Sequence, residues 1–413
     1  MADFPLVSAA TVSVPARPVR PGLTLGLLSL QHALIHGQSA LYPIVFLAIS
    51  AEFGIGAGAI AVLAAVGAIS TGLIQLTFGA LTRRFTKRSL LGVGGMAFGI
   101  GTAAQAAVSS FVAFVPVNVA SRLGGAPQHP VGNALLTEQY ASNRWGTAIS
   151  AHIAGGNIGT VVFGVIATGA VAIYGWRTSV LWLGVAAAIV GLCVYLFIRE
   201  AHAHPAASAH DRPTVKDDYR QVIRDRDLRW LFLSSVLGGG ARGLGVLNVF
   251  VPLYLAKVVG VDAATLGAMY AVLLAASVPG PLVAGWLSDK LGRKPLIVTV
   301  YTAGAVGLAL FVGVGPDITL LWGAIVFLSI FSFVESPQLQ ALLADISPPA
   351  IRDAAYSTYF ALAFGVGSMW GLVYGAIIAA TGEQQGLGTV FLVMAAANLG
   401  AALAVLPIRL HRP

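Results

Sequence analysis

The chain has 413 residues, of which 57% are hydrophobic and only 10% are charged, and its mean hydropathy is +0.83. Soluble domains carry roughly a quarter charged residues because their surface faces water, so this composition excludes a soluble globular protein and indicates a membrane protein. The single cysteine, Cys193, excludes a disulfide framework and is expected to be a small apolar side chain.

Apolar helices of bilayer-spanning length are expected along nearly the whole chain. Residues 1–21 are rich in proline and lack an apolar core, which predicts a cytoplasmic tail and not a cleaved signal peptide. The spans expected in the first half are 24–50, 56–81, 89–109, 111–137, 146–172 and 178–198. Those expected in the second half are 229–256, 263–287, 294–314, 318–345, 354–380 and 387–408. We predict two membrane domains, 22–199 and 228–413, joined by a cytoplasmic linker, 200–227.

The linker is the one substantial polar interval of the sequence. Its His202, His204 and His210 are compatible with a metal-binding histidine tract. We favour the simpler interpretation, a solvated connection between two membrane halves.

Lysine and arginine gather on one side of the predicted membrane. They occupy the linker, both termini and the loops after spans two and eight, and include Arg17, Arg20, Arg83, Arg84, Lys87, Arg88, Lys290, Arg293, Lys294, Arg409 and Arg412. The other side has only Arg177 and Lys257. Because positive loops stay in the cytoplasm, we expect an inner-membrane, multi-pass protein with both termini cytoplasmic. The net charge of +8 is then a topology signal, and no nucleic-acid partner is expected.

The two halves resemble each other at an offset of about 207 residues. The segment 134–138 (Ala-Leu-Leu-Thr-Glu) is echoed by 341–345 (Ala-Leu-Leu-Ala-Asp), and Pro130 corresponds to Pro337. The common order and offset indicate a duplicated six-helix unit. Transporters built from such parallel repeats place their site between the halves, near the middle of the membrane.

The segment 285–294, Gly-Trp-Leu-Ser-Asp-Lys-Leu-Gly-Arg-Lys, resembles the loop signature of the major facilitator superfamily. This resemblance implies an all-α membrane protein with about 12 transmembrane helices in two pseudo-symmetric six-helix bundles. It also implies that the loop is a cytoplasmic gate in which Asp289 holds a helix N-terminus and Arg293 pairs with Asp345. Gly285 and Gly292 would allow the close helix approach and the tight turn.

The first-half copy of this loop, 79–88, departs from the signature. It keeps Gly79, but Arg83 stands where the family has aspartate and Thr86 where it has glycine. We expect Glu138 to pair with Arg84, Lys87 or Arg88, and whether this copy still latches a helix stays open.

A narrower resemblance lies in spans four and five. The segments 128–134 (Gln-His-Pro-Val-Gly-Asn-Ala) and 155–159 (Gly-Gly-Asn-Ile-Gly) look like those of fosmidomycin-resistance-type exporters, and span one is similar around His32. Drug antiporters of the superfamily often carry Gly-Pro late in span five, where this chain has Phe163-Gly164.

Ionisable groups at membrane depth are expensive and are expected to face the interior. Glu335 is either a reversible proton carrier or the fixed partner of Arg242 or Arg122. The other candidate proton carriers are His129 and His152, since histidine titrates near neutrality.

The remaining candidates are predicted to bind substrate. Arg122 and Arg242 can grip an anion through planar donors. His32 and His36 share a helix face, which allows metal ligation, but with no further ligand nearby in sequence we expect pore-lining histidines and no metal. The predicted substrate-binding set is Arg122, Arg242, His32, His36, Gln128, His129, Asn157 and Gln338, although the amides are also suited to bonding helix to helix.

These features predict a secondary transporter that works by alternating access. We favour proton-coupled export of small anionic or amphiphilic compounds. The first alternative is organic-anion uptake by proton symport or exchange, and an alternative of another class is a membrane sensor or scaffold without transport. We expect no enzyme activity, no cofactor and a monomer.

Overall fold

The computed structural model describes residues 18–200 and 214–410, and the predicted tail and linker lie partly outside these ranges. The helices of the first half are α1 (Pro21–Phe53), α2 (Ala57–Ile74), α3 (Phe78–Leu81), α4 (Lys87–Ala104), α5 (Phe111–Gly125), α6 (Pro130–Gln139) and α7 (Trp145–Phe197). Those that follow are α8 (Val215–Arg224), α9 (Arg226–Gly238), α10 (Asn248–Tyr254), α11 (Ala263–Ala275), α12 (Pro279–Leu291), α13 (Arg293–Gly313), α14 (Ile318–Phe331), α15 (Glu335–Ile346), α16 (Arg352–Ala361), α17 (Trp370–Thr381) and α18 (Glu383–Val405).

Twelve membrane-spanning units can be counted in the part of the chain that the structure describes. Ten helical segments are long and apolar enough to cross a membrane. One of them, 142–197, is 56 residues long and counts as two, because the backbone leaves helical geometry at Gly175, whose φ of 77° suits glycine. The last span is 111–139, which is interrupted where Pro127 and Pro130 remove backbone donors. The predicted fold class is confirmed.

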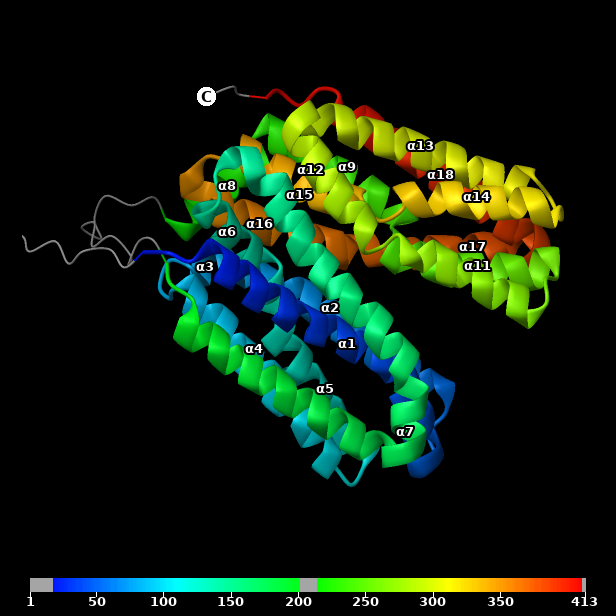
Figure 1. Cartoon of the computed structure of the whole chain (residues 1–413), viewed down its shortest axis with the longest axis horizontal. Coiled ribbons are helices and arrows are strands. Elements are labelled where there is room, and N and C mark those ends of the chain that lie inside the picture. Colours follow the sequence, from blue (N-terminus) through cyan, green and yellow to red (C-terminus); the bar gives the residue numbers. More distant parts are fainter. Residues whose placement is uncertain (1–17, 201–213, 411–413) are drawn as a thin grey trace, which may run out of the picture.

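The helices form two bundles, one for each half of the chain (Figure 1). In the first half α1 and α4 pack along α7, and in the second α9 and α13 pack along α18. Between the halves, α12 packs against α7, and α16 packs against α3 and α6. The bundles meet at the end that carries α3, α6, α8 and α16 and diverge toward the other end (Figure 1). We call the first end the basic end, because Arg83, Lys87, Lys290 and Arg293 lie there.

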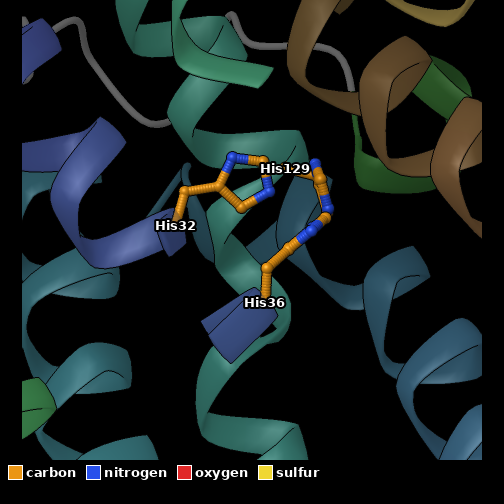
Figure 2. A group of neighbouring side chains, drawn as sticks. All are labelled: His32, His36 and His129. Atoms are coloured by element: carbon orange, nitrogen blue, oxygen red, sulfur yellow. The ribbon is translucent and has the colours of Figure 1, made fainter. Parts of the chain in front are cut away.

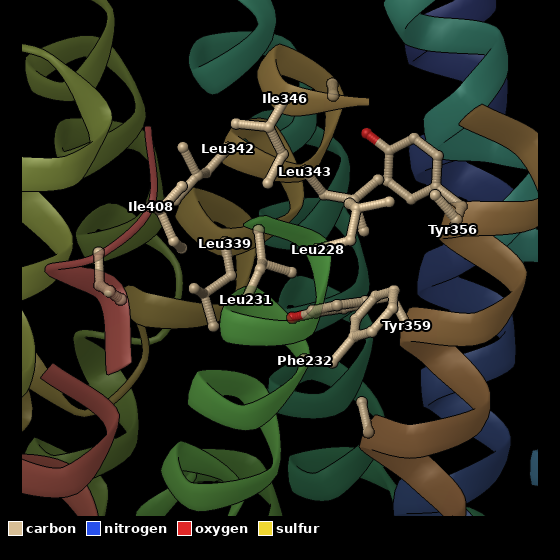
Figure 3. Packing of buried hydrophobic residues seen from close by; sticks show 14 of the residues in the cluster. Leu228, Leu231, Phe232, Leu339, Leu342, Leu343, Ile346, Tyr356, Tyr359 and Ile408 are labelled. Atoms are coloured by element: carbon tan, nitrogen blue, oxygen red, sulfur yellow. The ribbon is translucent and has the colours of Figure 1, made fainter. Parts of the chain in front are cut away.

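Apolar side chains cover both the interior and the outside of the bundles. Leu47, Val165 and Leu372 are 68%, 78% and 71% exposed, as suits surfaces that face lipid. At the basic end a buried cluster joins α9, α15 and α16, part of which Figure 3 shows. This cluster also includes Ala134 of the first half and Val222 of α8, so it connects both halves.

The described part of the linker is more ordered than a solvated connection. Helix α8 begins with a capping box between Thr214 and Asp217. It buries Val222 completely, and Tyr219 donates a hydrogen bond to the Leu76 carbonyl of the first half. The predicted linker therefore includes an amphipathic helix that packs on the basic end, a contact that the interpretation as a solvated connection did not include. His202, His204 and His210 lie outside the described residues.

Close backbone contacts between helices depend on particular glycines. A Cβ added to Gly159 of α7 would overlap the backbone of Ala33 in α1, whereas a Cβ on Gly164, five residues along the same helix, would meet nothing within 4 Å. Lipid supplies no hydrophobic drive for helices to associate, so such close packing holds the bundle together.

Replacing Gly159 with alanine should therefore lower the stability of the protein in detergent. Overpacking costs about 1–3 kcal/mol, whereas Gly164→Ala should be neutral or stabilising because alanine is the better helix former by about 1 kcal/mol. The apparent Tm of both purified variants measures the difference. Equal Tm values for the pair would contradict this account of the α1–α7 contact.

Candidate functional site

A cavity of about 620 Å³ lies between the two halves. Its walls come from α1, α7 and His129 in the first half and from the broken helices around Arg242 and Glu335 in the second. It is lined by His32, His36, His129, Ile153, Asn157, Gly239, Arg242, Gly243, Gly245, Val246, Val249, Phe250, Ser332, Phe333, Glu335, Ser336, Gln340, Tyr359, Phe360, Ala363, Phe364, Gly367 and Gly371. A site between repeats is what the internal duplication predicts.

The structure brings six of the predicted residues to this cavity: His32, His36, His129, Asn157, Arg242 and Glu335. The substrate and proton-coupling roles assigned to them stay predictions.

Four predicted residues lie elsewhere. Gln128 donates to the Leu28 carbonyl at 2.7 Å, and Gln338 donates to Ser150 at 3.0 Å, so both amides bond helix to helix. His152 is fully buried behind His32.

Arg122 is the fourth. Its guanidinium donates to Asn118 one turn earlier in α5 and lies 5.8 Å from the centre of the Tyr42 ring. This places it beside α1 and not among the residues that line the cavity. Glu335 accordingly pairs with Arg242 in this conformation, one of the partners that sequence reasoning left open.

The ion pair at the cavity joins two interrupted helices. Arg242 Nε lies 3.3 Å from Glu335 Oε1, and the two side chains are 18% and 6% exposed. The backbone of Arg242 is extended and comes shortly after the triple glycine 238–240. The amide of the next residue, Gly243, donates a hydrogen bond to the Ser332 carbonyl just before α15. Glu335 occupies the first turn of α15, where free amides and the helix dipole favour a negative charge. Two helix breaks thus set a buried charge pair in the cavity wall.

Histidines from three helical segments form the opposite wall. The His32 ring lies 4.5 Å from His36, 4.7 Å from His129 and 4.5 Å from His152, centre to centre. Figure 2 shows His32 and His36 on α1 and His129 beside them. His129 also stacks on Phe360 of the second half at 5.0 Å, so it touches both halves.

The second-half loop closes the basic end through Asp289. Its carboxylate accepts hydrogen bonds from the amides of Gly146 and Thr147 at 2.9 and 2.8 Å, at the N-terminus of α7. Arg293 bonds Asp289 at 2.6 Å and Asp345 at 2.7 Å. The loop of one half is thereby bonded to a helix of the other.

The predicted glycines of this loop are needed where they stand. Gly285 lies against Gly146 and Ser150 of α7, where a Cβ would approach the Gly146 carbonyl oxygen to 2.6 Å. Gly292 has a φ of 92°, a backbone conformation that favours glycine.

In the first half, the acid of the contact lies on the helix and the base on the loop. Lys87, at the place of Arg293 in the repeat, lies 2.8 Å from both Glu138 and Asp353. Asp353 is in the first turn of α16, at the position that Gly146 has in α7. The acid has therefore moved from the loop to the helix that the loop contacts, which explains how a loop carrying Arg83 in place of aspartate still meets the other half. Of the three bases considered for Glu138, Lys87 is the partner, and Arg84 is exposed.

Arg83 has its own partner in α8. Its guanidinium lies 2.6 Å from Asp218, and burial raises the pKa of that carboxyl even though the cation opposes the shift. Gly79 lies beside Tyr219 and Ala354, so α8, the first-half loop and α16 meet at one point.

Several residues of the site were not among the predicted set. Ser336, Gln340 and Tyr359 bring polar groups to the cavity, and Asp218 and Asp353 pair with bases of the first-half loop. Gln340 also joins helix to helix, since it accepts a hydrogen bond from Asn133 of the other half at 2.6 Å. The repeat offset of about 207 residues aligns Asp353 with Gly146. This alignment was the signal in the sequence from which the contact of Asp353 with the first-half loop could have been predicted.

Comparison with known proteins agrees with this architecture. The family model described as Major Facilitator Superfamily matches residues 28–244 and 243–413. The probable L-galactonate transporter of Escherichia coli is 26% identical over 311 residues, covering 71% of this chain and 68% of that protein. The cis,cis-muconate transport protein of Acinetobacter baylyi is 24% identical over 327 residues, covering 76% of each. In a solved structure, the fucose:proton symporter of E. coli has the same fold, with a TM-score of 0.77 at 13% identity over 94% of this chain and 98% of that one.

Removing Lys87 should loosen the basic end. Lys87→Gln leaves Glu138 and Asp353 facing each other without a cation. Because both acids are partly exposed, we expect a shift of about 1–2 kcal/mol, below that of a buried pair, or roughly 5- to 30-fold in the conformational equilibrium. A Cys193→Ser, Ala134→Cys background reports opening through the rate of maleimide labelling.

Arg84→Gln is the matched control, since it removes an exposed cation from the same loop. Labelling rates that rise equally in the two variants, or in neither, would contradict the assigned gate.

The stability of variants at Arg242 and Glu335 should show whether Glu335 is ionised. Removing one partner of a buried pair costs up to about 3–5 kcal/mol, because the other charge is left unpaired. Glu335→Gln and Arg242→Gln should each lower the Tm of the purified protein, and the double variant should recover part of the loss. A Glu335→Gln variant as stable as the parent would mean that Glu335 is already neutral.

Proposed function

The chain belongs to the Major Facilitator Superfamily, and on that premise we propose that it carries small organic anions across a membrane by alternating access of its two halves. The observation that carries the proposal is the cavity between the halves. Arg242 lies in its wall and pairs there with one carboxylate, that of Glu335. A guanidinium is well suited to a substrate carboxylate because its paired donors match the two oxygens.

The rest of the lining suits a small anion with polar substituents. Asn157, Ser336, Gln340 and Tyr359 offer hydrogen-bonding groups, while Phe333, Phe360 and Phe364 make an apolar side. Two of the relatives are named as transporters of L-galactonate and of cis,cis-muconate, and both compounds are carboxylates. We infer carboxylates of that size as the first substrate class to test.

Proton coupling follows from competition for Arg242. When Glu335 is ionised it occupies the guanidinium, and when a proton neutralises it, the guanidinium is released for the substrate anion. Binding of the anion and of the proton would then favour each other, which couples the two in one cycle. His129 and His152 are the proposed further proton carriers, since His129 lines the same cavity and His152 stacks on His32 directly behind it.

The orientation is also a proposal. Cytoplasmic loops carry the excess of lysine and arginine, so the basic end would face the cytoplasm of an inner membrane, with both termini inside. The ion pair of Lys87 with Asp353 and the hydrogen bonds of Asp289 to α7 join the halves at that end, and the bundles diverge at the other (Figure 1). We therefore assign this conformation to the outward-facing state of the cycle, gated by the 79–88 and 285–294 loops.

The direction of net transport has two candidates. Uptake by symport with a proton agrees with the Glu335–Arg242 competition. Export agrees with the resemblance of segments 128–134 and 155–159 to fosmidomycin-resistance-type exporters.

Flux into proteoliposomes tests the proposal. The parent should accumulate a labelled anion (muconate, galactonate, gluconate or fosmidomycin) under an imposed proton gradient. Arg242→Gln should weaken apparent affinity by roughly 10- to 100-fold, since a bond to a charged group contributes about 1.5–3 kcal/mol. Glu335→Gln mimics the protonated acid and should keep anion exchange but lose gradient-driven accumulation, with Arg84→Gln as the control.

Other outcomes assign the protein differently. Gradient-driven loss of preloaded anion, with no accumulation, would favour export. Parent-like flux in both cavity variants would refute the site, and no flux for any compound would favour a membrane sensor or scaffold.

A further inference from the structure

Three histidines of the cavity wall form a cluster with the geometry of a metal site. One ring nitrogen from each of His32, His36 and His129 lies within 4.8 Å of the others. Figure 2 shows the three rings gathered around a common space. The sequence revealed only the pair on α1, and the fold supplies the third member from the turn between Pro127 and Pro130.

Hydrogen bonds on the far sides of two rings prepare their free nitrogens for a ligand. His32 Nδ1 lies 3.0 Å from the His152 carbonyl oxygen, which can only accept, so Nδ1 carries the proton and Nε2 presents a lone pair. His36 Nδ1 lies 3.1 Å from the Thr160 hydroxyl. Metal-bound histidines nearly always donate their second N–H in this way, to a carbonyl or another acceptor.

The nitrogens left over are buried and unpartnered within the described residues. His32 Nε2 and His129 Nδ1 have no hydrogen-bond partner, and His32 is fully buried. A buried polar atom without a partner is destabilising, and lone pairs converging from several rings point to a cation that accepts them.

The charges nearby permit a cation. The charged side chains that line the cavity together with the histidines are Arg242 and Glu335, and they pair with each other. The cation therefore meets a neutral pair and three neutral rings.

We propose that His32, His36 and His129 bind one divalent transition-metal ion of the Zn²⁺, Co²⁺ or Ni²⁺ class. Nitrogen ligands at 2.0–2.1 Å require the three donor atoms to approach one another from within 4.8 Å to about 3.3 Å on binding. The remaining coordination position faces the cavity and is available to water or a carboxylate. The site does not depend on which anion the cavity carries, since it is built from the wall opposite Arg242.

Metal binding to the purified full-length protein tests the proposal. The background carries His202, His204, His210 and His411 replaced by serine, together with Cys193→Ser, and has no affinity tag, so that other donors do not contribute. Titration with Co²⁺ should saturate at one ion per chain with the intense visible bands of a four-coordinate site, and Zn²⁺ should displace it. His36→Gln and His129→Gln should weaken binding by about 100-fold or more.

A pair of variants outside the ligand set makes the test independent of the histidines themselves. Thr160→Val removes the acceptor for His36 Nδ1 and should weaken binding roughly tenfold, in the range known for such supporting contacts. Thr160→Ser keeps the hydroxyl and should bind like the background. Size-exclusion elution and the metal-free Tm verify that each variant is folded.

The proposal is overturned if the background binds no saturable equivalent of Co²⁺ or Zn²⁺. It is also overturned if His36→Gln and His129→Gln bind like the background. If either histidine variant does not fold, equal affinities of Thr160→Val and Thr160→Ser would overturn it. Because the readout is binding alone, these results stay separate from any failure of anion flux.

Discussion

The bond between the Asp289 carboxylate and the first amides of α7 is the interaction on which the closed basic end depends. In a membrane, two apolar bundles gain little from contact with each other that lipid would not also provide. Specific polar bonds and close glycine contacts must therefore hold the halves together. Asp289 satisfies free amides of a helix N-terminus in the other half, and Arg293 keeps it in place while also bonding Asp345. Gly285 and Gly292 let the loop approach that closely.

The first half reaches the same end with a different distribution of charge. Asp353 on α16 replaces the loop acid, Lys87 joins it to Glu138, and Arg83 turns to Asp218 of α8. Equivalent positions of the two halves thus make contacts at the basic end, but the charges at those positions differ. This arrangement also ties α8 to the first-half loop, because Arg83 of that loop pairs with Asp218 of α8.

Closure at one end decides what the middle of the molecule can hold. The helices that meet there are interrupted at Gly239–Ala241 and just before Glu335, and these interruptions present Arg242 and Glu335 to the cavity. The histidine cluster lies on the other wall, where His129 stacks on Phe360 across the interface. Costly polar groups are therefore concentrated between the halves. Under the proposed alternating access, a ligand or proton that bound there would change the balance between the two states.

The spans, the duplication and the second-half loop were predictable, because hydropathy, charge placement and a repeated motif are local signals. The pairing of Arg293 with Asp345 followed from the family resemblance. The positions of Arg122, Gln128 and Gln338 relative to the cavity were not predictable, since a polar residue in a span can face either the cavity or a neighbouring helix. His129 could not be grouped with His32 and His36, because helical periodicity does not predict where a side chain points when it lies in an interruption between Pro127 and Pro130. The packing of α8 was missed because its polar composition resembles that of a solvated linker.

Paired distances at the two ends of the molecule test the central claim, that closing the basic end and opening the opposite end are one motion. In a Cys193→Ser background, spin labels at Phe85 and Leu291 report the basic end, and labels at Val112 and Leu320 report the other. All four side chains are exposed. When Asp289→Asn and Lys87→Gln weaken the gate, pulsed electron paramagnetic resonance should show the first distance lengthen and the second shorten. A basic end that opens while the opposite distance stays unchanged would contradict alternating access and mean that the loops only fray.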